Sequence, residues 1–143
     1  MKTNTQYYIT EEVQSADPSR LIEMLYQRAL RDLHAAREMW PMLDSAPKGI
    51  HLAVHAQCIL KELQCALNYQ EGGELAATLG RLYEYMQFRI VEIVGRKSGD
   101  DAAEIDEVIE LLSSLSEAWS TMMARQRNVR TSDVLIPGGS LVA

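Results

Sequence analysis

Apolar residues recur every three or four positions along most of this chain, and no other feature limits its fold so strongly. This spacing is that of one face of an α-helix, whereas the strict alternation of a half-buried strand is nearly absent. Four such stretches occur, at about residues 18–40, 48–70, 74–95 and 102–127. Four helices of roughly 20 residues, joined by short turns, predict an all-α fold, an antiparallel four-helix bundle.

Residues that start and stop helices separate these stretches. Asp17-Pro18 predicts the first start, because aspartate suits the N-cap and proline suits the first helical position. Pro41 and Pro47 bracket the end of the first helix. Gly72-Gly73 predicts the end of the second helix and a tight turn, since glycine accepts the left-handed conformation of a C-cap. The positions expected to face the core are Leu21, Ile22, Leu25, Ala29, Leu33, Ala36, Trp40, Leu52, Ala56, Ile59, Leu60, Leu63, Ala66, Leu67, Leu75, Leu79, Leu82, Met86, Ile90, Ile93, Ile105, Val108, Leu112, Leu115, Trp119 and Met122.

The chain of 143 residues has the length of one domain, in which we expect three parts. Residues 17–127 form the bundle, residues 1–16 a short lead segment and residues 128–143 a flexible C-terminal tail. The lead segment mixes polar residues with Tyr7 and Tyr8, so we expect a mobile cover that lays aromatic side chains on an apolar groove. The tail is either conditionally ordered in a groove or an inert, frayed terminus.

A net charge of −6 limits the partners of the chain. An acidic surface repels phosphate, so nucleic acid and an anionic membrane are poor partners. No window approaches the ~18 consecutive apolar residues of a membrane helix, which predicts no membrane insertion. The first residues lack the apolar stretch of a secretory signal, so a cytoplasmic location is expected.

The chain lacks the motifs of common catalytic and cofactor-binding sites. None of its three histidines follows a glutamate by three positions, which argues against the di-iron sites of helical bundles. No phosphate-binding loop, His-Glu-x-x-His or Gly-x-Ser-x-Gly motif occurs. We therefore expect neither an enzyme nor a cofactor.

One set of metal-ligand residue types does share a helix face. His51, His55 and Cys58 are spaced i, i+4 and i+7, and Glu62 and Cys65 continue the stripe. Zinc accepts such ligands, but the same residues equally make a weakly apolar second face of the helix. A structural zinc site usually takes ligands from two elements, and no second cluster is present in the sequence, so no metal is expected. The two cysteines, ~10 Å apart along a helix, are expected to remain free thiols.

Two stretches of the chain are familiar when they are taken together. The first is Ser15-Ala16-Asp17-Pro18, followed by Leu21-Ile22-Glu23-Met24-Leu25-Tyr26. The second is Gly72-Gly73-Glu74-Leu75-Ala76, followed by Leu82-Tyr83-Glu84-Tyr85-Met86. With Ala118-Trp119 near the end of the fourth helix, the chain resembles the FliS family of flagellin export chaperones over about residues 7–120.

The resemblance implies a small cytoplasmic bundle that binds the disordered C-terminal segment of flagellin. Such a chaperone keeps flagellin from polymerising before export and delivers it to the flagellar type III secretion apparatus, where the export gate protein FlhA is the implied partner. Two other functions stay open. One is a helical adaptor for another secretion-system or regulatory protein, and the other is a His/Cys metal-binding bundle.

The client-binding site is expected on apolar helix surface in excess of what one core needs. We place it on the second and third helices, beside the turn at Gly72-Gly73. Its residues there are Cys58, Cys65, Tyr69, Ala77, Gly80, Tyr85 and Phe88. Tyr7 and Tyr8 would cover it, and Gly80 would be an exposed small residue that lets a client helix approach. The wide apolar arc of the first helix around Tyr26 is the second location.

Overall fold

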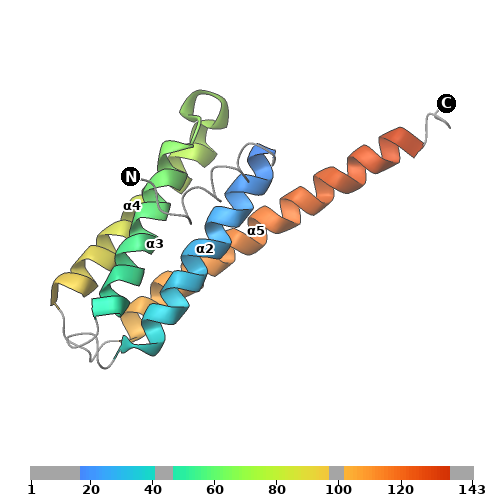
Figure 1. Cartoon of the computed structure of the whole chain (residues 1–143). Helices are drawn as coiled ribbons and strands as arrows, with labels where there is room; N and C mark the ends of the chain where they lie inside the picture. Colours follow the sequence, from blue (N-terminus) through green and yellow to red (C-terminus); the bar gives the residue numbers. More distant parts are fainter. Residues whose placement is uncertain (1–16, 41–46, 97–101, 136–143) are drawn as a thin grey trace, which may run out of the picture.

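In the part of the chain that the structure describes, four helices run alternately in opposite directions (Figure 1). The computed structural model describes residues 17–40, 47–96 and 102–135, and their side chains except those of 96 and 129–135. The helices are α2 (Pro18–Glu38), α3 (Pro47–Cys65), α4 (Tyr69–Arg96) and α5 (Ala102–Leu135). The predicted all-α antiparallel bundle is confirmed. The lead segment with Tyr7 and Tyr8 lies outside the described residues.

Helix α2 begins as its sequence predicts. The Asp17 side chain accepts a hydrogen bond of 3.0 Å from the backbone N–H of Arg20, and Pro18 occupies the first helical position. This cap satisfies one of the N–H groups that a helix start leaves without a partner. At the other end Met39 is the C-cap, and the buried Trp40 follows it.

The corner between α3 and α4 differs from its prediction. Helix α3 ends at Cys65, and the Asn68 side chain then accepts hydrogen bonds from the backbone N–H groups of Gln70 (3.1 Å) and Glu71 (3.0 Å). Asn68 therefore caps α4, so the turn comes before the glycine pair. Gly73 instead makes a kink within α4, at φ 52° and ψ −128°, a backbone conformation open to glycine.

Helix α5 is longer than its apolar periodicity predicts. It continues to Leu135, so the expectation that it ends near Arg127 is wrong. The physical reason is that the stretch contains no helix breaker, and the first proline after it is Pro137. In Figure 1 the C-terminal half of α5 runs away from the other three helices.

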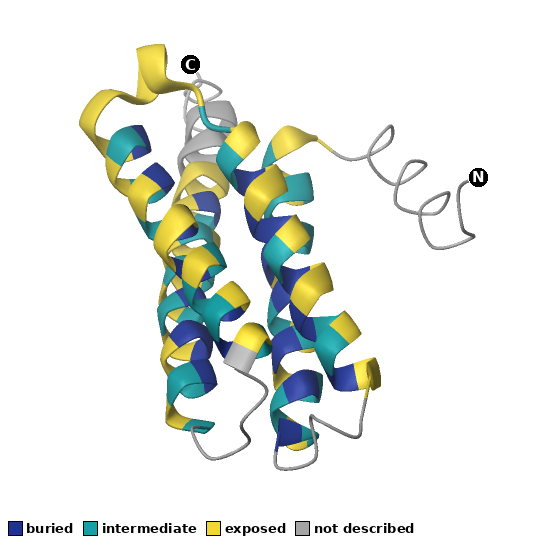
Figure 2. Ribbon diagram, turned by 90° about the vertical axis from the view of Figure 1, so that its left-hand side faces the viewer, coloured by how far each residue is buried: buried dark blue, intermediate teal, exposed yellow. Residues whose placement is uncertain are grey.

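Buried residues form stripes along the inward faces of the helices (Figure 2). Most of them are positions that the sequence predicts to face the core, and Tyr26 and Tyr83 join them. The core cluster consists of Tyr26, Ala29, Leu33, Ala36, Trp40, Ala53, Ala56, Ile59, Leu60, Leu63, Tyr83, Met86, Ile90, Ile93, Ile105, Val108, Ile109 and Leu112. Helix α5 packs more extensively on α2 than on α4. Within the described residues, no helix has both the length and the hydropathy that crossing a bilayer requires.

Candidate functional site

An open groove of about 630 Å³ lies between α2, α4 and α5, at the end of the bundle where α3 turns into α4. Its polar residues, Asn68, Glu71 and Gln126, are exposed and lie at the rim. The remaining lining is apolar or aromatic, apart from the backbone at Gly72. These lining residues are Ile22, Tyr26, Leu63, Ala66, Leu67, Leu75, Ala76, Leu79, Tyr83, Trp119 and Met122.

The walls of the groove include residues at predicted core-facing positions that no neighbouring helix covers. Leu75 and Met122 were expected in the core, but they are 67% and 38% exposed. Leu79, one turn after Leu75 on α4, and Trp119, about one turn before Met122 on α5, are only partly buried. The prediction that Leu75 and Met122 pack in the core is therefore wrong, because the C-terminal part of α5 diverges from α4 (Figure 1).

Side-chain bonds fasten the first turns of α5 to both of its neighbours. Arg89 of α4 pairs with Glu104 at 3.4 Å and with Glu107 at 3.3 Å. From α2, Arg37 pairs with Asp106 at 2.8 Å. These bonds are part-exposed and each is worth little alone, but together they fix where α5 begins.

Further along α5, the contact is with α2. The indole N–H of Trp119 donates a hydrogen bond of 3.1 Å to the backbone carbonyl of Ser19. Helix α5 thus follows α2 and leaves α4, which opens the groove on the α4 side.

Two tyrosines form the floor of the groove. Tyr26 of α2 and Tyr83 of α4 are 2% and 3% exposed, and their hydroxyl groups are hydrogen-bonded to each other. Their ring centroids are 6.5 Å apart with the planes tilted by 48°. Burial raises the pKa of both phenols, and for Tyr83 the hydrogen bond with Tyr26 raises the pKa further. Both hydroxyls are therefore neutral at physiological pH.

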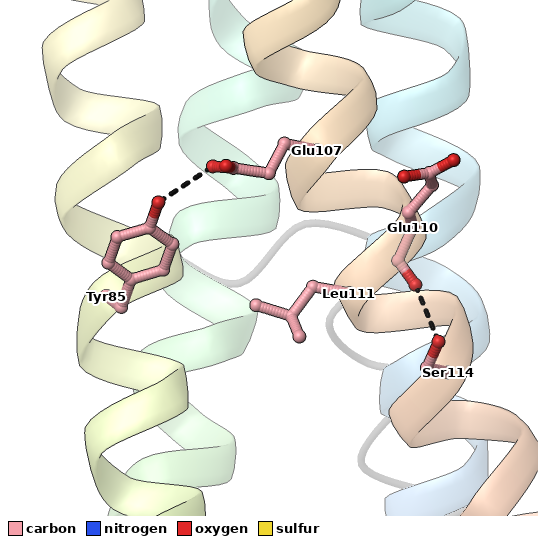
Figure 3. Close-up of a pocket in the computed structure, with 5 residues that line it drawn as sticks. All are labelled: Tyr85, Glu107, Glu110, Leu111 and Ser114. Atoms are coloured by element: carbon pink, nitrogen blue, oxygen red, sulfur yellow. Dashed lines mark hydrogen bonds between the residues drawn. The ribbon is translucent and has the colours of Figure 1, made fainter.

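A second, shallower hollow of about 400 Å³ lies between α4 and α5 (Figure 3). The Tyr85 hydroxyl donates a hydrogen bond of 2.8 Å to Glu107, and this bond raises the pKa of the tyrosine. Leu111 points towards α4 between them, while Glu110 and Ser114 line the α5 side. The hollow is lined by two carboxylates, a tyrosine, a serine and one aliphatic side chain.

The structure brings only one of the described site predictions to the groove, namely Tyr26. Tyr26 is buried, so it lies at the floor of the groove and is not part of the exposed apolar surface expected on α2. The other predicted residues do not line this groove. They are Cys58, Cys65, Tyr69, Ala77, Gly80, Tyr85 and Phe88. Tyr69, Tyr85 and Phe88 are 51%, 43% and 62% exposed. Both cysteines, Cys58 and Cys65, are free and exposed.

The prediction that Gly80 lies on an exposed face is wrong. Gly80 is buried, and a Cβ atom built on it would lie 2.6 Å from the hydroxyl oxygen of Tyr69. Tyr69 precedes the kink at Gly73, which brings its ring back over the later turns of α4. Gly80 therefore accommodates a side chain of its own helix.

The histidine–cysteine stripe of α3 points to solvent. His51, His55 and Cys58 are exposed, and His55 Nδ1 lies 2.5 Å from a carboxylate oxygen of Asp32 on α2. In residues 17–40, 47–96 and 102–135, no three His, Cys, Asp or Glu side chains lie close enough together to hold a metal ion. The stripe therefore gives the metal-binding alternative no support.

The match to a family model and the matches to individual relatives agree with one another. The chain matches the sequence model of the family described as flagellar protein FliS over residues 1–126, a span that includes the whole lining of the groove. The flagellar secretion chaperone FliSB of Pseudomonas aeruginosa is 40% identical over 119 residues, which cover 83% of this chain and 91% of that protein. The flagellar secretion chaperone FliS of Salmonella typhimurium is 37% identical over 119 residues, which cover 83% of this chain and 86% of that protein. The flagellar secretion chaperone FliS of Bacillus subtilis is 29% identical over 123 residues, 86% of this chain and 88% of that protein.

Proposed function

The chain belongs to the FliS family of flagellar secretion chaperones, and from that premise we propose that its apolar groove binds the C-terminal segment of flagellin before export. The relatives are named as chaperones, which agrees with a role without catalysis. Binding in the groove would keep the segment from assembling with other flagellin subunits. The chaperone then delivers its client to the flagellar export apparatus.

The observation that carries this proposal is the uncovered part of the core. Leu75, Leu79 and Met122 are spaced like core residues on their helices, yet they face an open groove. An amphipathic client segment can bury its own apolar residues against them at i, i+3, i+4 and i+7. Each Å² of apolar surface removed from water contributes about 25 cal/mol.

The cellular setting follows from the same premise. We place the chaperone in the bacterial cytosol, where flagellin waits for export, with the gate protein FlhA as the partner that receives the complex. We expect the lead segment with Tyr7 and Tyr8 to lie over the client surface and to take part in docking at the gate. Removal of residues 1–16 should then change client affinity or export while the bundle stays folded.

The groove is tested by placing a cation in its wall. Leu75→Arg is expected to weaken binding of a labelled flagellin C-terminal peptide at least tenfold, because a charge in an apolar groove must be desolvated by the client. The position is 67% exposed, so circular dichroism should show an unchanged fold. Fluorescence anisotropy measures the affinity.

Phe88→Arg is the matched control. Phe88 also lies on α4, is 62% exposed and does not line the groove, so this variant is expected to bind as the native chain does. Loss of binding in Phe88→Arg but not in Leu75→Arg would instead place the client on the α3–α4 surface expected from the sequence. A native chain that binds no flagellin would favour an adaptor for another secretion-system protein.

A further inference from the structure

The floor of the groove contains a polar pair within an apolar lining. Tyr26 and Tyr83 line the groove and their hydroxyl groups are hydrogen-bonded to each other, while Ile22, Leu63 and Leu79, which also line it, are aliphatic. Their hydrogen bond joins α2 to α4, and it also places two polar groups among apolar lining residues. The pair therefore bears on which clients fit.

A count of hydrogen atoms shows what the pair offers. Two hydroxyls carry two hydrogens, and the bond between them uses one. In the described part of the chain, the hydrogen bond recorded for these side chains is the one to each other. The second O–H can therefore donate to a group that enters the groove, and the raised pKa values of both phenols keep this proton in place.

We propose that the Tyr26–Tyr83 pair selects clients that place an uncharged side-chain oxygen on the groove floor. The inference rests on the proposed function and specifies the client chemistry. The acceptor is an Asn or Gln carbonyl or a Ser or Thr hydroxyl, because the backbone carbonyls of a bound helix are already used within the helix. A carboxylate is disfavoured, since it would be desolvated in an apolar groove on a chain of net charge −6.

A purely apolar client would cover the free O–H and leave it without a partner. A buried donor without an acceptor is costly, and sites built to hydrogen-bond a group reject the analogue that lacks it. We expect the matched acceptor to favour binding by about tenfold over an apolar residue of similar size.

The test is a double-mutant cycle between chaperone and client. The chaperone variant is Tyr26→Phe/Tyr83→Phe, which removes both hydroxyls and keeps the shape of the floor, a change that can be nearly neutral for stability. The client variants exchange each uncharged polar residue of the flagellin C-terminal segment for an apolar residue of similar size. One client position is expected to weaken binding to the native chaperone about tenfold and to have little effect on binding to the double variant.

Tyr85→Phe is the control, because it deletes a tyrosine hydroxyl that faces Glu107 outside the groove. If native and double-variant chaperones respond alike to every client exchange, the selection by the tyrosine pair is wrong while flagellin binding stands. If the native chaperone binds no flagellin, the proposed function and this inference both fall. If the double variant unfolds, the client exchanges are measured on the native chaperone alone. The inference is then overturned if none of the client positions weakens binding about tenfold.

Discussion

Two glycines of α4 carry opposite expectations for substitution by alanine. Gly80 lies in regular helix, and a Cβ there would meet the hydroxyl end of Tyr69, an exposed side chain that can turn aside. Gly80→Ala should raise the free energy of unfolding by up to about 1 kcal/mol, because glycine loses more backbone entropy on folding. Gly73→Ala should lower it by about 1–3 kcal/mol, because φ is +52°. Denaturant unfolding compares the two, and a loss of stability in Gly80→Ala would show that Tyr69 is held in place.

The tyrosine pair makes a separate prediction about pH. Burial raises the pKa of Tyr26 and Tyr83 above the ordinary value of 10.0, so the folded chain holds these protons more tightly than the unfolded chain does. The resulting stability is complete below about pH 10 and is lost as the pH rises above it. Unfolding midpoints between about pH 9 and pH 11 should therefore fall more steeply for the native chain than for Tyr26→Phe/Tyr83→Phe. Parallel decreases would mean that the hydroxyls are not buried in solution.

Among the elements, α2 offers the clearest test of a local signal. Asp17→Ala removes the side-chain acceptor at the N-cap and should lower the free energy of unfolding by about 1 kcal/mol. Asp17→Ser keeps an oxygen acceptor and should be nearly neutral. Thermal unfolding followed by circular dichroism measures both. Equal losses would show that the aspartate stabilises α2 by its charge and not by the cap.

Helix existence and type could be predicted from the sequence, because periodicity and caps are local. The Asn68 cap was missed because the glycine pair a few residues later is the stronger stop signal, although only the asparagine side chain bonds to the start of α4. The groove could not be predicted. Leu75 and Met122 follow the same period as their buried neighbours, and their exposure depends on the angle between α4 and α5, for which the local sequence has no signal.

At one end of the bundle, ion pairs join α5 to α2 and α4, and at the other end the groove separates α5 from α4. Amides of α3 around Leu60 and of α4 around Ile90, which lie in the core, should exchange slowly with deuterium. Amides in the C-terminal part of α5 should exchange faster, because this part runs away from the other helices (Figure 1). Addition of the flagellin segment should slow exchange near the groove and leave the core unchanged. Uniform exchange along α5 would contradict this description of the bundle.

The open groove also couples the stability of the chaperone to the binding of its client. A segment that fills the groove buries apolar surface, so the heat capacity change of binding should be negative. Because the segment binds the folded and not the unfolded bundle, a free concentration of 100 times Kd adds about 2.7 kcal/mol to the stability of the chaperone. The melting temperature of the chaperone therefore depends on how much client is present. On the proposed function, the client completes a hydrophobic core that the chaperone forms only in part, and each protein stabilises the ordered state of the other.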